Sequence, residues 1–196
     1  MEVHLEGLVF DGTGSPSPTY TLSSDGLEGL FGGSGVRRDD VARAAQHGSF
    51  ALPGYRDGRG IMLGGNVYSD GPFGQDRDLA ALSSVLGDGG RGVLTFQSEG
   101  GTRWATVELA RSPQVEILVY GRVARYQLQL RAPDPRLYGE TQVHTGSTVD
   151  AHHYGNFPAS PVVEVAGPRA AYTITGPGGR TVQVTQALAD GQSHRI

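Results

Sequence analysis

The sequence predicts a mainly-β protein with a single α-helix, and three features carry that prediction. The 31 glycines and 11 prolines among the 196 residues divide the chain into short segments, because both residue types interrupt helices. Residues 123–131 alternate apolar and polar side chains with the period of a half-buried strand. Residues 75–86 have the helical spacing of apolar side chains. We therefore expect a β-sheet core on which one helix packs.

Strand-like segments and turn signals alternate through the first seventy residues. Residues 3–10 form one expected strand, which the Gly- and Pro-rich residues 12–18 close. Strand character resumes at residues 20–22, whereas the glycines within residues 25–33 indicate irregular backbone. Residues 50–52 and 59–68 are expected to pair with each other across two turns, Pro53-Gly54 and Asp57-Gly58. Residues 36–47 show no period, and we expect a mobile loop or an arm that a neighbour orders.

The expected helix has a clear apolar stripe. Leu79, Leu82 and Leu86 follow i, i+3, i+7 spacing, and Val85 lies alongside them. Asp76 or Asp78 is the expected N-cap and Gly87 the expected C-cap. Four further strands follow, at residues 93–97, 103–111, 115–120 and 123–131. In the last of these, one face is expected to be buried; it consists of Ala124, Tyr126, Leu128 and Leu130.

A proline-rich segment, residues 132–139, divides the chain into two expected domains. Its two prolines cannot donate to a central strand, so we predict a hinge between residues 1–131 and residues 140–196. The second part contains short β segments at 141–149, 162–165 and 194–196. It also contains a hairpin that joins 172–175 to 180–185.

The composition excludes several classes of protein. All 16 basic residues are arginine, and 20 acidic residues give a net charge of -4, which argues against a polybasic surface for nucleic acid or membrane. The absence of cysteine excludes disulfides, thiolate metal sites and cysteine nucleophiles. The charged N-terminus and the lack of a long apolar run predict a soluble protein without signal peptide or membrane span.

Catalytic signatures are missing as well. The sequence has no nucleophile elbow, no phosphate loop with its lysine and no His-Glu-x-x-His pair. His152 and His153 are adjacent and would point to opposite faces of a strand, which disfavours chelation of one metal ion. Asp39, Asp40, Asp76 and Asp78 have no converging partner in the sequence and fit solvated charge or helix capping. We expect no enzyme and no catalytic, cofactor-binding or metal-binding residue.

Four segments in register resemble one known family. They are RAPDPRLYG at residues 131–139, NFPASPVVEV at 156–165, DGLEGLF at 25–31 and HGSFALPGYRDGR at 47–59. In this order and spacing, together with the lone helix, they resemble the distal tail protein (Dit) family of siphoviruses, often described as phage tail family proteins.

The resemblance implies a fold, a role and partners. The implied fold is an N-terminal β-sandwich with one helix, followed by a galectin-like β-sandwich. The latter is expected to be partial here, because that domain of the family runs beyond the position of Ile196. The implied role is a structural protein of the virion tail tip, or baseplate, made in the host cytoplasm. Its homohexameric ring joins the tail tube to the hub or tail-fibre protein and surrounds the tape-measure protein and the DNA channel, without specific nucleic-acid binding.

Candidate contact residues follow from both lines of reasoning. Unpaired sheet edges need a neighbour, and the charged residues of the expected arm are candidate inter-subunit contacts: Arg37, Arg38, Asp39 and Asp40. The candidate hinge residues are Pro133, Asp134, Pro135 and Tyr138, with Tyr138 as the anchor. Arginine-only basicity fits bidentate ion pairs between subunits, and biased codon usage would give the same count.

Two other functions remain open at this point. The alternative is a lectin-like module that contacts cell-wall sugar through the aromatic residues Tyr154, Phe157 and Tyr172, although these residues also fit core filling. A small cell-wall hydrolase has no identifiable catalytic pair to support it.

Overall fold

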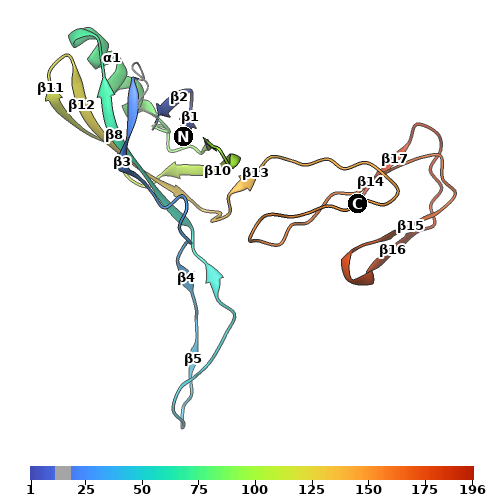
Figure 1. Ribbon diagram of the computed structural model, residues 1–196. Coiled ribbons are helices and arrows are strands. Elements are labelled where there is room, and N and C mark those ends of the chain that lie inside the picture. The colour runs from blue at the N-terminus through green and yellow to red at the C-terminus, as the bar shows by residue number, and fades with distance from the viewer. Residues whose placement is uncertain (12–18) are drawn as a thin grey trace. The chain divides into compact units, whose positions relative to one another are not determined.

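A computed structural model describes residues 1–11 and 19–196 of the chain (Figure 1). The described residues are mainly β, as predicted, with one α-helix. The chain divides into two compact units, Met1–Val143 and His144–Ile196. Within the described residues, no helix is long and apolar enough to span a membrane.

The first unit is built on one sheet that closes on itself. In the described residues nine strands follow the order β11-β12-β8-β3-β2-β1-β9-β10-β13, and β10 also pairs with β12. That last pairing, Glu108 opposite Arg131 and Leu109 opposite Leu130, closes a barrel-like ring of strands. The family resemblance implies a β-sandwich for this unit; the structure has one closed, barrel-like sheet instead. The main strands are β1 (Glu2–Leu5), β2 (Leu8–Asp11), β3 (Tyr20–Glu28), β8 (Arg59–Tyr68), β9 (Gly92–Ser98), β10 (Gly101–Leu109), β11 (Gln114–Val119), β12 (Val123–Ala132) and β13 (Tyr138–Gly139).

The first expected strand is a hairpin instead. β1 and β2 pair antiparallel, Leu5 opposite Leu8, and the chain reverses through Glu6 and Gly7, whose φ angles are 48° and 83°. Two successive positive φ angles define the tight hairpin turn that matches strand twist. The prediction of one continuous strand was wrong because glutamate rarely adopts this conformation. The turn expected at residues 12–18 lies outside the described residues.

A hairpin arm connects β3 to β8. It contains β4 (Val36–Arg37) paired with β7 (Tyr55–Arg56), and β5 (Val41–Ala42) paired with β6 (Ser49–Phe50). Figure 1 shows this narrow ribbon extending from β3 and β8 away from the helix. The sequence predicted that residues 50–52 pair with 59–68. This prediction was wrong, because β8 pairs with β3 and β12 instead. Nor is the segment 25–33 wholly irregular, since β3 continues to Glu28 past a register shift between Leu22 and Leu27.

The single helix begins earlier than expected. α1 spans Gly71–Ser84, with Asp70 as N-cap, a proline in its first turn and Val85 as C-cap. Proline is favoured there because the first helical N–H groups have no partner within the helix. The caps predicted at Asp76 or Asp78 and at Gly87 were therefore wrong. The predicted apolar stripe is helical only in part: Leu79 and Leu82 pack on the core from the helix, whereas Val85 and Leu86 are buried just beyond its end at Ser84.

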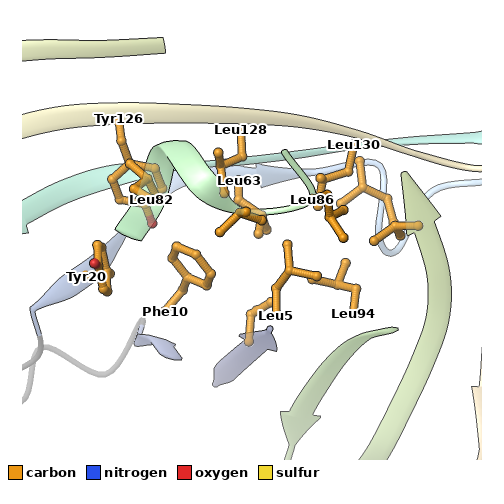
Figure 2. Packing of buried hydrophobic residues seen from close by; sticks show 14 of the residues in the cluster. Leu5, Phe10, Tyr20, Leu63, Leu82, Leu86, Leu94, Tyr126, Leu128 and Leu130 are labelled. Carbon is orange, nitrogen blue, oxygen red and sulfur yellow. The ribbon is translucent and has the colours of Figure 1, made fainter. Parts of the chain in front are cut away.

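One continuous hydrophobic core fills the first unit. Figure 2 shows side chains of the barrel strands and of the helix pointing toward one another. The predicted inward face of β12 is confirmed, because Ala124, Tyr126, Leu128 and Leu130 are at most 1% exposed. The Phe10 ring lies 5.6 Å from both the Tyr20 and the Tyr126 rings.

The second unit consists of short strand pairs. β14 (Glu164–Ala166) pairs with β17 (Ser193–Arg195), and β15 (Tyr172–Thr175) pairs with β16 (Thr181–Val184) across the 3₁₀ turn η1 (Pro177–Gly179). The β15–β16 hairpin is the one predicted. The β segment expected at residues 141–149 was wrong, because no strand lies there. Among the described residues of this unit, the buried hydrophobic side chain is that of Leu188.

Candidate assembly interface

The arm exposes its entire length to solvent. All residues from 35 to 57 are exposed, including large apolar side chains that a folded domain normally covers: Val36, Val41, Phe50, Leu52 and Tyr55, which are 43–63% exposed. A run of exposed apolar side chains on a projecting ribbon is typical of a surface that another chain covers. The sequence predicted an exposed loop or arm at residues 36–47; the structure has a longer, paired hairpin that extends to Arg56.

The arm also carries four charged residues that the sequence singled out. Asp40 Oδ1 accepts a hydrogen bond of 3.1 Å from the Leu52 backbone N–H, so it braces the two sides of the ribbon. Arg37, Arg38 and Asp39 form no ion pair with any part of the chain that the structure describes. These three charges are available to a partner.

A buried arginine fixes the base of the arm. Arg59, at the start of β8, is 8% exposed. Its Nη1 donates to the carbonyls of Gly29, Leu30 and Gly32 at 2.6–3.1 Å, and its Nε donates to the Pro135 carbonyl at 3.0 Å. Burial, with a smaller contribution from the Arg56 charge, lowers the pKa of this guanidinium. The hydrogen bonds satisfy the cation with backbone oxygens, so the loop after β3 is held at β8.

β11 is a free, apolar sheet edge. It ends the strand order and pairs with β12 alone among residues 1–11 and 19–196, so within that part of the chain one row of its backbone N–H and C=O groups has no strand partner. All six of its residues are exposed, Val115, Ile117, Leu118 and Val119 being 37–52% exposed. A long edge with apolar side chains on both faces invites pairing with another chain.

A buried glutamine holds the end of that edge against the helix. Gln75 on α1 is 1% exposed; its amide donates to the Val119 carbonyl at 3.3 Å and accepts from the Gly121 N–H at 2.9 Å. The turn between β11 and β12 is therefore fixed beside the first turn of the helix. Phe73 and Tyr120, 84% and 67% exposed, lie at this end of the unit.

The predicted hinge residues form a compact surface cluster. Tyr138 on β13 stacks on Trp104 of β10, with ring centroids 4.6 Å apart and an interplanar angle of 21°. Its hydroxyl donates to Asp134 Oδ2 at 2.7 Å. The Arg136 side chain binds the same carboxylate, which holds the pKa of Asp134 well below its usual range. Pro133 and Pro135 flank Asp134, and the whole cluster lies in the first unit.

The candidate sugar-binding aromatics do not form one platform. Tyr154 is 84% exposed and contacts His152, with ring centroids 4.2 Å apart. The Tyr172 hydroxyl lies 2.9 Å from His194 Nδ1. Among the described residues, no ring contact joins Tyr154 or Phe157 to Tyr172.

The histidines and carboxylates that the sequence raised are not gathered into a site. Nowhere in residues 1–11 and 19–196 do three His, Asp or Glu side chains converge as metal ligands would. His153 Nε2 lies 2.6 Å from the Phe157 carbonyl, and Asp78 accepts from Ser69 at 2.8 Å. The expectation of no catalytic role stays a prediction.

Three residues that support the candidate interface and the hinge cluster were not singled out from the sequence: Arg59, Gln75 and Trp104. Arg59 and Gln75 are polar residues in apolar surroundings, and only the fold reveals their backbone partners. Trp104 lies in the strand expected at residues 103–111 and was given no role there, although it is the one tryptophan of the chain, and that rarity was the available signal.

These features define a class: a mainly-β domain with a closed sheet, one packed helix and a projecting hairpin arm. A solved structure with a similar fold is that of the Dit protein (gp 19.1) of SPP1, described as a paradigm of the hub adsorption apparatus in phages that infect Gram-positive bacteria. The TM-score is 0.51 at 15% sequence identity, over 79% of this chain and 53% of SPP1 Dit. This chain thus spans about half the length of that protein and has a Dit-like fold, in agreement with the sequence resemblance. No family model matches the chain, and no curated protein matches it.

Proposed function

We propose that this chain is a structural protein of a siphovirus tail tip. In this proposal its first unit forms a homohexameric ring that continues the tail tube and holds the hub or tail-fibre protein. The ring surrounds the end of the tape-measure protein and the DNA channel. The observation that carries the proposal is the Dit-like fold over 79% of the chain, reached independently by the motif resemblance at residues 131–139 and 156–165.

The exposed surfaces support assembly into a ring. The arm offers apolar side chains and unpaired charges, and β11 offers a free backbone edge. Two different surfaces on one chain that fit each other make a head-to-tail contact, and such contacts form a ring when the rotation between successive subunits closes. In this proposal the arm of each subunit lies along the β11 edge of its neighbour, and Arg37, Arg38, Asp39 and Asp40 fix the register. The number of subunits in the proposed ring, six, is taken from the family resemblance.

The remaining parts of the proposal concern the second unit and the channel. In this proposal the second unit forms part of a galectin-like domain. A conduit for DNA works best when it does not grip phosphate, and the net charge of -4 with no lysine agrees with that role. The protein acts by assembly and carries no catalytic activity.

The oligomeric state of the full chain tests this function. We expect mass photometry to give a species of six times 20.6 kDa, and negative-stain images to show rings with sixfold symmetry. A monomer throughout the concentration series, or a closed dimer, would contradict the ring.

A variant of the arm tests the contact. Phe50→Ser with Tyr55→Ser removes two exposed arm side chains, 58% and 63% exposed, and we expect rings to dissociate into folded monomers. Tyr154→Ser, at an 84% exposed tyrosine of the second unit, is the matched control and should leave the ring intact. Rings that survive the arm variant would place the interface elsewhere.

A further inference from the structure

The segment that leaves the barrel is held by two layers of contact. In the inner layer, the Pro135 carbonyl accepts from Arg59 Nε at 3.0 Å, and Leu137 packs against the hydrophobic core. In the outer layer, Tyr138 stacks on Trp104, and β13 pairs with β10, Trp104 opposite Tyr138. The chain after Gly139 has no strand until Glu164.

Asp134 organises the outer layer although it does not touch Trp104. Its carboxylate accepts from the Arg136 backbone N–H at 3.1 Å, which forms a short turn, and from Arg136 Nε and Nη2 at 2.8–3.1 Å. It also accepts from the Tyr138 hydroxyl at 2.7 Å. The Arg136 guanidinium lies 5.7 Å from the centre of the Tyr138 ring. One carboxylate therefore fixes the turn, the arginine and the tyrosine at once.

We propose that residues 134–138 form a clasp that sets where the tether to the second unit begins, with Asp134 as its positioning residue. With the clasp closed, the tether consists of residues 140–143, between β13 and the second unit. At about 3.3 Å per residue this tether reaches about 13 Å, whereas one that begins at residue 138, beyond the inner layer, reaches about 20 Å. The clasp thus limits the space that the second unit explores.

The clasp is also placed where it can open without unfolding the barrel. Trp104 and Tyr138 are each 36% exposed, and the side chains of Asp134 and Arg136 are 37% and 49% exposed. Exposed stacking and ion pairs are individually weak, so the outer layer opens more readily than the core. This inference does not depend on the proposed ring, because every contact lies within one subunit.

The single tryptophan makes the clasp measurable in the full chain. Tyr138→Ala should increase quenching of Trp104 fluorescence by acrylamide. It should also lower hydrogen-exchange protection of residues 138–139 about tenfold, which corresponds to about 1.4 kcal/mol for loss of a stacked aromatic pair. Tyr138→Phe keeps the ring and loses the bond to Asp134, so we expect a smaller change in the same direction.

The decisive variant is Asp134→Ala. It leaves the Tyr138 ring that stacks on Trp104 in place, yet a clasp positioned by Asp134 predicts stronger Trp104 quenching and lower protection at residues 138–139. Glu116→Ala removes another exposed carboxylate paired with an arginine, Arg125 at 3.4 Å, and should change neither readout. Wild-type quenching and protection in Asp134→Ala, with Tyr138→Phe also unchanged, would overturn the assignment.

Discussion

The two units of the chain differ in how much side-chain surface each removes from water. The barrel holds the entire buried hydrophobic cluster, from Val3 on β1 to Ala132 at the end of β12. Among the described residues of the second unit, Leu188 is the buried hydrophobic side chain, and its backbone bonds to Arg169 at 2.8 and 2.9 Å. The second unit therefore relies on hairpin backbone bonds where the barrel relies on packing.

The difference predicts unequal stability. Buried apolar surface contributes about 25 cal/mol per Å², against a cost of about 1–2 kcal/mol to order each residue's backbone. An isolated two-stranded hairpin is marginal in water for this reason. We expect the barrel to unfold in one cooperative transition and the second unit to open at lower free energy. The following predictions test that contrast.

The largest expected effect is in the barrel core. Phe10→Ala removes the ring between Tyr20 and Tyr126 and should lower the free energy of unfolding of the barrel by about 3–5 kcal/mol. Urea denaturation followed by Trp104 fluorescence measures it. Phe73→Ala, at an 84% exposed phenylalanine, should have little effect. Equal losses of unfolding free energy in Phe10→Ala and Phe73→Ala would contradict the difference in burial between the two side chains.

The next largest loss of stability is expected at Gln75, a buried polar residue of α1. Gln75→Met keeps the side-chain size but leaves the Gly121 N–H without its partner, whereas the Val119 carbonyl keeps its bond from the Arg122 N–H at 3.0 Å. Each buried group left unsatisfied costs about 1–3 kcal/mol, so the same urea experiment should give a clear loss. Gln114→Met, at an exposed glutamine of β11, is the control. A neutral Gln75→Met would mean that water replaces the amide.

A smaller loss, confined to the second unit, should follow from Leu188→Ala. This change removes the one buried hydrophobic side chain there, and the thin surrounding packing suggests a cost at the low end of such substitutions, about 2 kcal/mol. Hydrogen exchange should lose protection in β14 and β17 and stay unchanged in β8 and β12. Val182→Ala, at a 48% exposed valine, should be mild. Loss of barrel protection would show that the units unfold together.

The smallest expected effect is that of pH on the clasp. Arg136 holds the pKa of Asp134 below its usual range, so the stabilisation by this carboxylate is present above the pKa of the unfolded chain. It is lost only as pH falls through the lower pKa of the folded state. Trp104 quenching should therefore stay constant between pH 7 and about 4. A transition within that interval would mean that Asp134 is not held in its charged form.

Local sequence patterns predicted the elements whose side chains face one core. The alternation along β12 and the stripe of α1 are periodic, so burial could be read from them directly. The hairpin turn at Glu6 was missed because propensity argues against a positive φ at glutamate. Closure of the barrel through Glu108 and Arg131 depends on residues far apart in the chain, and no local pattern records it.

The candidate interface was predictable only in part, because local sequence patterns indicate exposure but not the order of strands in the sheet. The charges at Arg37 and Asp39 lie in a segment without apolar periodicity, which predicts exposure. The strand at residues 115–120 was predicted, but its apolar composition did not reveal that it is a free edge. Edge position is a property of sheet order, which long-range pairing decides.

Arg59 gives the barrel a mechanical property. One guanidinium bonds the carbonyls of Gly29, Leu30 and Gly32, where the chain departs toward the arm, and the carbonyl of Pro135, where it departs toward the second unit. Force on the arm or on the segment that leads to the second unit is thus resisted at the same side chain, and loss of its bonds at one of these segments weakens its hold on the other. Lysine could not substitute, since a single ammonium lacks the planar fork that reaches oxygens on two segments.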